Sequence, residues 1–418
     1  MSTPLHLAVG LDGAGWHPAA WREVPPRPSE VFSGQDLLGA VLRLEEAGVA
    51  AVTFEDGLGL QPDEDGRVDP AAVDRFTGRL DASLVAAWLA GRTSRIGLIP
   101  SITTTHTEPF HTATNIASLD HASRGRAGWR PQISARAHEA AHVGRRDLSG
   151  LADPRTREAL VADLLAETAD AVEVARLLWD SWEDDAEIRD AATGRFIDRD
   201  RLHRAAFTGR QFSVLGPSIT PRPPQGQPVV VVLAHTPAVH ELAARSADVV
   251  LITPADDADV PRVVGQVRAA EDRVGRTGRP LQVWADVVVG LGPTDAAAAT
   301  RLADLDARAG RPYTSDAAVL TGSAATLAGR LTDWHAAGLD GVRLRPLGHH
   351  VDVPAIAGDL APALGAGTAT SPAGTPGTTL RERLGLGPAP NRFTGAPPFT
   401  TTGAGTGTAT ISATGATA

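Results

Sequence analysis

A closed parallel barrel of eight β/α units is the fold class that the sequence predicts. Short runs rich in Val, Ile and Leu alternate with longer amphipathic stretches, and this alternation indicates βαβ units. Continuous apolar runs such as Val229–Leu233 are typical of strands covered on both faces, as in a parallel sheet. The 418 residues are enough for a TIM barrel with insertions. A doubly wound open sheet is the competing layout, and the number of strands does not exclude it.

Eight segments are predicted to be the strands: Leu5–Leu11, Ala51–Glu55, Arg95–Ile102, Ala127–Ile133, Pro228–Ala234, Asp248–Thr253, Leu281–Leu291 and Gly341–Leu347. The amphipathic stretches expected to be helices include Gln35–Ala47, Leu80–Gly91, Leu160–Trp182, Ala238–Arg245 and Ala324–Ala337. Glycine marks two expected helix ends, before the second strand and before the last one.

One barrel domain is expected over residues 1–364, with a polar insertion at about 183–227 between the fourth and fifth strands. The insertion reads as an addition at one rim of the barrel. Residues 365–377 are rich in Gly, Ala, Thr, Ser and Pro, which is typical of a flexible linker. A short charged segment follows at 378–393. The tail at 394–418 has almost no core-forming side chains, and we expect it to be disordered.

The composition excludes several function classes. The formal net charge of −10 argues against a nucleic-acid surface, because phosphate binding relies on clustered Lys and Arg. The absence of cysteine removes disulfides, thiolate metal sites and a cysteine nucleophile. The first residues lead into an apolar strand without a basic or long apolar leader, and no stretch is long enough to span a membrane. We therefore expect a cytoplasmic protein that binds neither nucleic acids nor membranes.

Six motifs stand out along the chain: Ala20–Arg22, Leu44–Leu58, Thr93–His111, Leu119–Trp129 (LDHASRGRAGW), Leu178–Pro217 (beginning LWDSWEDDA) and Thr378–Arg392. Together they resemble the bacterial-luciferase-like flavin-dependent monooxygenase superfamily, in the branch that includes nitrilotriacetate and dibenzothiophene-sulfone monooxygenases. The resemblance implies a TIM barrel that uses reduced FMN from a separate flavin reductase, together with O2, and forms a flavin hydroperoxide that oxidises an organic substrate. By analogy it also implies a homodimer.

The resemblance assigns cofactor contacts to the carboxyl ends of strands, where TIM barrels build their active sites. It places Asp56 near the isoalloxazine ring, and the length of the surrounding match favours this role over the alternative of a helix cap or a loop carboxylate. Thr103 and Thr104 would hydrogen-bond the ring, although Thr is also an ordinary strand residue. Ser134 follows the fourth strand, with a surface loop position as the alternative. Thr236 offers a hydroxyl group to the FMN phosphate.

Histidines supply the candidates for proton transfer. His17 and His106 lie in the first and third βα loops, and His111 lies close by. A histidine with a near-neutral pKa can move a proton, although a lone loop histidine is more often simply solvated. His349 and His350 follow the eighth strand, but neighbouring residues point apart in an extended segment and no carboxylate stands at a suitable spacing. We therefore predict no metal site.

The chain departs from the family pattern at several cofactor positions. After the fifth strand the family has Ala-Gly-Ser-Ser, a cradle for the phosphate, whereas this chain has His235, Pro237 and His240. Glycines allow close approach to a phosphate, and proline removes an N–H donor. Arg130 replaces a family Asn beside the flavin, and Leu165 replaces a Tyr. The sequence therefore predicts a divergent cofactor site.

An FMNH2-dependent, two-component monooxygenase is the leading functional hypothesis, with a substrate that the sequence does not identify. The alternative is a non-catalytic paralogue that acts as a partner subunit or a small-ligand-binding barrel with an eroded phosphate site. An enzyme using a deazaflavin is a third hypothesis, against which the branch-specific insertion argues. Specificity is expected to lie in the βα loops and in the insertion.

Overall fold

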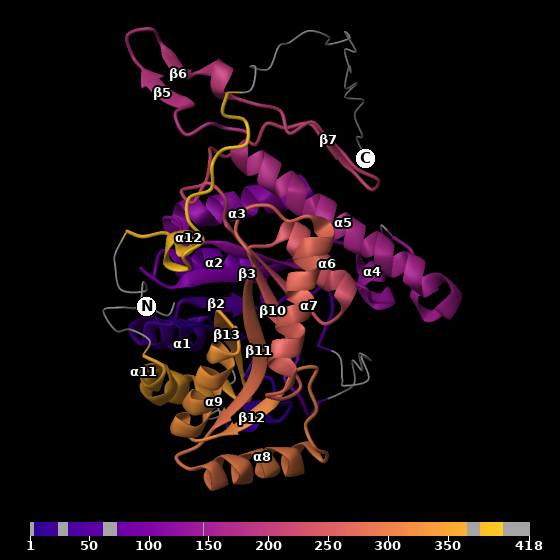
Figure 1. Cartoon of the computed structure of the whole chain (residues 1–418), viewed down its shortest axis with the longest axis vertical. Helices are drawn as coiled ribbons and strands as arrows, with labels where there is room; N and C mark the ends of the chain where they lie inside the picture. The colour runs from indigo at the N-terminus through magenta and orange to yellow at the C-terminus, as the bar shows by residue number, and fades with distance from the viewer. Residues whose placement is uncertain (1–3, 24–31, 62–72, 145, 366–376, 396–418) are drawn as a thin grey trace, which may run out of the picture.

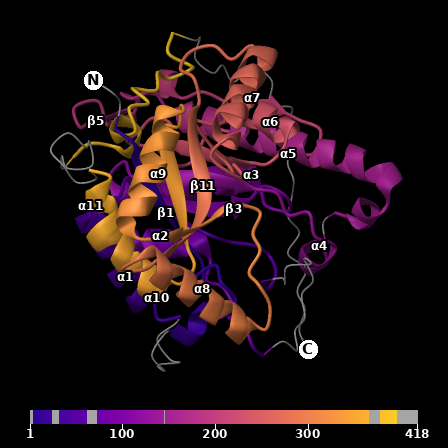
Figure 2. The same cartoon turned by 60° about the horizontal axis from the view of Figure 1, so that its bottom comes forward.

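The computed structural model describes residues 4–23, 32–61, 73–144, 146–365 and 377–395. Eight parallel strands form a closed barrel in the order β1-β2-β3-β4-β9-β10-β11-β13, and β13 pairs with β1 to complete it. Figures 1 and 2 show the helices arranged around these strands. The strands are β1 (His6–Leu11), β2 (Ala51–Phe54), β3 (Gly97–Thr103), β4 (Gly128–Gln132), β9 (Val229–Ala234), β10 (Val249–Ile252), β11 (Gln282–Leu291) and β13 (Gly341–Pro346). Each coincides with a predicted strand, so the barrel is confirmed and the open sheet is excluded.

The longest strand, β11, closes the barrel and carries an additional strand. Its first half, Gln282–Ala285, pairs with β10, and Trp284–Val289 pairs with β13. Its last four residues, Val288–Leu291, pair with β12 (Val319–Gly322), which the sequence analysis did not predict. β12 contains only two apolar residues in a row, Val319 and Leu320, so it lacks the continuous apolar run that marks most of the other strands.

Helices cover the outer face of the barrel and follow the strands. They are α1 (Gln35–Glu46), α2 (Ala82–Ala90), α3 (Pro109–Ser123), α4 (Ala137–Val143), α5 (Pro154–Asp180), α6 (Pro237–Ser246), α7 (Asp259–Val274), α8 (Asp295–Ala309), α9 (Ala324–Ala336) and α10 (His349–Ala355). The helix predicted at Leu160 starts six residues earlier, because Asp153 accepts the N–H of Arg155 and Pro154 occupies the first turn.

The interior of the barrel is apolar toward the amino ends of the strands. Ala8, Ile99, Val231, Leu251 and Trp284 belong to one buried cluster there. The Trp284 ring lies so close to the backbone of β13 that a Cβ at residue 341 would stand 2.7 Å from it, which explains the glycine at this position. This half of the barrel is therefore a packed core and not a channel.

The insertion lies at the amino ends of the strands. It runs between the end of α5 and the start of β9 and contains two hairpins, β5–β6 (Glu187–Asp190 and Arg195–Ile197) and β7–β8 (Phe207–Thr208 and Ser213–Val214). Figure 1 shows β5 and β6 at the opposite end of the molecule from β12 and α8. Because TIM-barrel sites lie at the carboxyl ends of strands, this position does not support the expectation that the insertion sets specificity.

The charged C-terminal segment packs under the amino end of the barrel. Its short helix α12 (Leu380–Arg383) buries Leu380 completely, and Arg381 forms an ion pair with Asp248 at 2.7 Å. The predicted linker and tail lie outside the described residues, apart from residues 365, 377, 394 and 395. Within the described part of the chain, no helix is both long and apolar enough to cross a membrane.

Charged side chains fill the barrel interior toward the carboxyl ends of the strands. Six of them form a continuous series of ion pairs, which we call the ion chain: Arg130, Glu55, Arg343, Asp286, Arg345 and Asp316. The two arginines of β13 share one carboxylate, since Arg343 Nη1 lies 3.0 Å from Asp286 Oδ1 and Arg345 Nε lies 2.9 Å from Asp286 Oδ2. The exposed fraction is only 1% for Arg343 and 0% for Asp286, so these charges depend on one another for solvation.

Removing one arginine from the ion chain should be costly. We expect Arg343→Met to lower the free energy of unfolding by about 3–5 kcal/mol, because three carboxylates would then share two arginines in a buried site. Urea unfolding measures this change. The matched control is Arg155→Met, which removes an arginine whose side chain is 89% exposed and pairs with Asp153, and which should change stability by less than about 1 kcal/mol. Equal losses in the two variants would contradict this account of the ion chain.

Candidate functional site

The ion chain closes the centre of the barrel mouth. Trp16, from the loop after β1, lies over it, with the Arg343 guanidinium 5.7 Å from the centre of the indole ring. Gly10 makes room for both side chains, since a Cβ at this position would stand 2.8 Å from each of them. A ligand that approaches the centre of the barrel from the carboxyl ends of the strands would therefore contact Trp16 and the ion chain.

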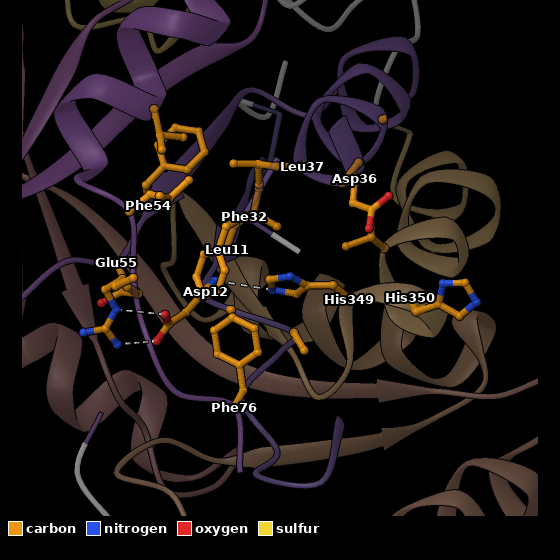
Figure 3. Close-up of a pocket in the computed structure, with 18 of the residues that line it drawn as sticks. Leu11, Asp12, Phe32, Asp36, Leu37, Phe54, Glu55, Phe76, His349 and His350 are labelled. Carbon is orange, nitrogen blue, oxygen red and sulfur yellow. Dashed lines mark hydrogen bonds and ion pairs between the residues drawn. The ribbon is translucent and has the colours of Figure 1, made fainter. Parts of the chain in front are cut away.

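A cavity of about 480 Å³ lies to one side of this closed centre, at the carboxyl ends of β1 and β2. Its floor includes Leu11, Asp12, Phe54 and Glu55, and its walls come from α1, the start of α2 and the start of α10. Figure 3 shows Phe32, Phe54 and Phe76 around it. Because the chain has only nine Phe, three on one cavity make its lining distinctly aromatic. Its volume and its largely apolar walls are those of a small-molecule site.

Glu55 joins the cavity to the ion chain. It lines the cavity, and its carboxylate is bonded to the guanidinium groups of both Arg130 and Arg343. Burial alone would raise the pKa of Glu55, but Arg130 and Arg343 outweigh burial and hold the pKa at about 2. Glu55 is therefore a fixed anion at neutral pH and is neutralised by its partners.

A second ion pair and a histidine line the same cavity. Arg79 donates two hydrogen bonds to the Asp12 carboxylate, from Nε to Oδ1 at 3.0 Å and from Nη2 to Oδ2 at 2.7 Å. His349 Nε2 faces the backbone N–H of Asp12 at 3.4 Å, and burial lowers the pKa of His349 to about 4. His349 is therefore neutral at pH 7, and its Nε2 can accept a hydrogen bond.

His349 and His350 begin α10, so the expectation that they lie in an extended segment is wrong. Gly348 precedes the first helical residue, and the N–H of His349 bonds back to the carbonyl of Ala14. In Figure 3, His349 points toward Asp12 and His350 points away from it. Among the described residues, no group of three or more His, Cys, Asp or Glu is arranged to hold a metal ion.

Asp56 lies beside Glu55 and is engaged with the backbone. Its carboxylate accepts the N–H of Gly57 at 2.7 Å and the N–H of Ala82, in the first turn of α2, at 2.8 Å. Burial raises the pKa of Asp56 even though these two bonds favour its charged form. These contacts fit the alternative of a helix-capping carboxylate, and a role beside the flavin stays a prediction.

The predicted hydroxyl groups after β3 and β4 are buried and bonded within the protein. Thr103 Oγ1 lies 3.1 Å from the Thr107 hydroxyl, and Thr104 Oγ1 lies 2.8 Å from the Thr168 hydroxyl of α5. The Ser134 hydroxyl donates to Glu139 Oε2 at 2.6 Å. None of Thr103, Thr104 and Ser134 lines the cavity at β1 and β2. Each of these three hydroxyl groups thus has a hydrogen-bond partner within the protein. Their role in binding the cofactor stays a prediction.

The three candidate proton-transfer histidines do not meet in the structure. His17 is buried, with Nε2 3.1 Å from Asp306 Oδ1 of α8 and Nδ1 accepting the N–H of Ala19. His106 is buried in the loop after β3 with a positive φ of 72°. His111 is exposed on α3. None of the three lines the cavity, whereas His349 does.

The departures from the family pattern occupy three separate places. Arg130 faces the barrel interior and is neutralised by Glu55, while Leu165 is half-buried on α5. Thr236 and His235 are exposed at the start of α6, and Pro237 is its first residue. His240 is buried on α6, and neither of its ring nitrogens has a hydrogen-bond partner among the described residues.

Sequence reasoning missed the residues that line the cavity: Asp12, Glu55, Arg79 and the three phenylalanines. It also missed the ion chain, although one signal was available. Asp286 lies within the apolar run of β11, and Arg343 and Arg345 occupy alternate positions of β13. Charged residues inside apolar strands are rare unless they are paired, so they mark a place where partners must exist.

Known proteins resemble this chain over most of its length. The sequence profile of the family described as "Luciferase-like monooxygenase" matches residues 16–383. The N-acetyl-S-(2-succino)cysteine monooxygenase of Bacillus subtilis (strain 168) is 32% identical over 72% of this chain and 64% of its own length. Nitrilotriacetate monooxygenase component A of Aminobacter aminovorans is 32% identical over 70% of this chain and 64% of its own length. The chain thus spans less than two thirds of the length of these relatives.

Solved structures support the fold independently. The EDTA monooxygenase EmoA from Chelativorans sp. BNC1 superposes with a TM-score of 0.77 over 92% of this chain and 99% of its own, at 21% sequence identity. The long-chain alkane monooxygenase LadA superposes with a TM-score of 0.78 over 92% of this chain and 96% of its own, at 19% identity. At these identities the likeness establishes the barrel alone. The profile match over residues 16–383, which includes every barrel strand except β1, places the chain in the luciferase-like monooxygenase family.

Proposed function

We propose that the chain is a flavin-dependent monooxygenase that oxidises a small organic molecule with O2 and receives reduced flavin from a separate reductase. The observation that carries this proposal is the family match over residues 16–383, which includes β2 and the helices α1, α2 and α10 at the cavity but begins after β1. The name of the nitrilotriacetate relative, component A, marks that protein as one part of a larger enzyme and supports a reductase partner here. The proposed cofactor is FMN in its reduced form.

The organic substrate is proposed to occupy the cavity at β1 and β2. Its aromatic walls favour a neutral, largely apolar molecule, and enclosure by α1, α2 and α10 would keep water from the reacting atoms. The Asp12–Arg79 pair and the neutral His349 are among the polar groups that could orient a substrate. The lining also includes Gln35, Asp36 and Arg43. We propose that the flavin ring stands at the inner edge of the cavity, beside Asp56 and the ends of β2, β3 and β4.

The described residues suit the flavin ring better than they suit the flavin phosphate. The cavity supplies apolar walls for a ring system, whereas the start of α6 lacks most of the N–H donors that bind a phosphate. Bound reduced flavin would supply the oxygen-activating chemistry, and the protein would bind, orient and exclude water. The predicted homodimer stays a prediction.

Reduced FMN should bind the purified chain with micromolar affinity under anaerobic conditions. Quenching of tryptophan fluorescence measures this binding, and oxidised FMN serves as the comparison. With a flavin reductase and NADH added, a substrate search by oxygen uptake becomes possible. If neither redox state binds, the monooxygenase proposal fails, and the chain is better regarded as a partner subunit or a ligand-binding barrel.

Filling the cavity should remove its binding capacity without unfolding the protein. Gly39 lies on α1 and lines the cavity, and a Cβ there would meet nothing within 4 Å, so Gly39→Trp fills space and replaces a poor helix former. We expect this variant to weaken binding of indole, a neutral ring probe, at least tenfold, as judged by ligand-observed NMR.

Gly265→Trp is the matched control for this experiment. Gly265 lies within α7, outside the cavity lining, and its Cβ position is equally open. This control should bind indole as the unmodified chain does. Indole binding that survives in Gly39→Trp would show that the cavity is not the site of ring binding.

A further inference from the structure

The start of α6 is the place at which the family resemblance puts the flavin phosphate, and it offers few hydrogen-bond donors. Pro237, the first helical residue, has no N–H group. The N–H groups of Val239 and His240 both donate to the carbonyl of Thr236, each at 3.0 Å. The Thr236 side chain does not cap the helix. A phosphate at this terminus would thus find one backbone donor in the first turn, at Ala238, and the exposed Thr236 hydroxyl beside it.

The side chain that could replace these donors with charge is already engaged. His235 is exposed, but its Nδ1 lies 2.9 Å from the Thr253 hydroxyl and its Nε2 lies 3.5 Å from Asp316 Oδ2. Burial would raise the pKa of Asp316, but the ion pair with Arg345 outweighs it and lowers the pKa. His235 therefore faces a carboxylate that remains charged at neutral pH.

The neighbouring loop adds further negative charge. β10 pairs with β9, so the segment after β10 lies next to the start of α6, and it carries Asp256, Asp257 and Asp259. Arg330 pairs with Asp257 and Arg262 pairs with Asp259, which leaves these cations occupied. Asp256 accepts the backbone N–H of Asp259. This loop therefore brings carboxylates and already paired arginines toward the start of α6, which is a poor environment for a phosphate dianion.

We infer that this chain recognises flavin without a contribution from the 5′-phosphate, so that riboflavin binds as tightly as FMN. This inference rests on the proposed function, because it concerns the same cofactor site. A phosphate held by charge-assisted hydrogen bonds strengthens binding by roughly tenfold or more per bond. Because Pro237 has no N–H and the N–H groups of Val239 and His240 are bonded within the helix, we expect little of that preference to remain in this chain.

The test compares reduced FMN with reduced riboflavin on the full chain under anaerobic conditions, by calorimetry or tryptophan fluorescence. We expect dissociation constants that agree within about threefold, and little effect of added salt, since no phosphate charge is bound. Tighter binding of FMN by tenfold or more would overturn the inference while leaving the proposed function intact. Absence of binding by both flavins would overturn the proposed function and the inference together.

A gain-of-recognition variant tests the physical cause. His235→Gly with Pro237→Ser restores a backbone N–H, adds a hydroxyl group and opens space at the start of α6. We expect this double variant to bind FMN at least tenfold more tightly than the unmodified chain, with riboflavin affinity unchanged. An unchanged FMN affinity would overturn the assignment of the loss to these residues.

The matched control replaces a proline in another short helix. Pro362 is exposed in α11 (Ala361–Ala363), which Figures 1 and 2 place on the other side of the barrel from α6. Pro362→Ser removes a proline and adds a hydroxyl group there, and it should leave both flavin affinities unchanged. A gain in FMN affinity in this control would contradict the assignment to α6.

Discussion

The ion chain across the barrel mouth is the constraint on which the rest of the site depends. Its six charges come from β2, β4, β11, β13 and the loop before β12, and only a closed barrel brings these elements within ion-pair distance. Buried charges of this kind are tolerated only when each one is paired. Pairing with arginines keeps Glu55 ionised on the cavity floor. It also holds the Arg343 guanidinium group under the Trp16 ring. The centre of the barrel is thus closed, and the open volume lies over β1 and β2.

This arrangement changes how the family pattern should be understood. Arg130, which departs from a family asparagine, is not a free cation beside the cofactor, because Glu55 and the Ser101 hydroxyl take up its guanidinium group. The loss of the phosphate cradle at α6 is more consequential, since Pro237 removes an N–H donor there and His235 already faces Asp316. The change at the start of α6 should therefore affect cofactor binding more than Arg130 does, although the sequence alone does not distinguish them.

The sequence predicted the barrel well because each strand is a local signal. Apolar runs mark several barrel strands, such as β9 and β10, while β12 has only two apolar residues in a row. The sequence predicts an extended segment at the histidine pair after β13, whereas α10 begins at His349. The cavity could not be predicted, because it joins residues from the two ends of the chain, such as Asp12 and His349. Contacts between distant segments depend on the barrel geometry and leave no local pattern.

A crystal structure with bound, photoreduced FMN tests the central claim most directly: the mouth of this barrel is closed by paired charges, and flavin is held from the β1–β2 side without its phosphate. The account predicts density for the flavin ring beside Asp56 and the cavity, an intact ion chain, and a phosphate that makes no hydrogen bond to α6. Phosphate oxygens within about 3 Å of the N–H groups of Ala238 or Val239 would contradict it, as would a ring seated in the barrel centre with the Arg343–Asp286 pair broken.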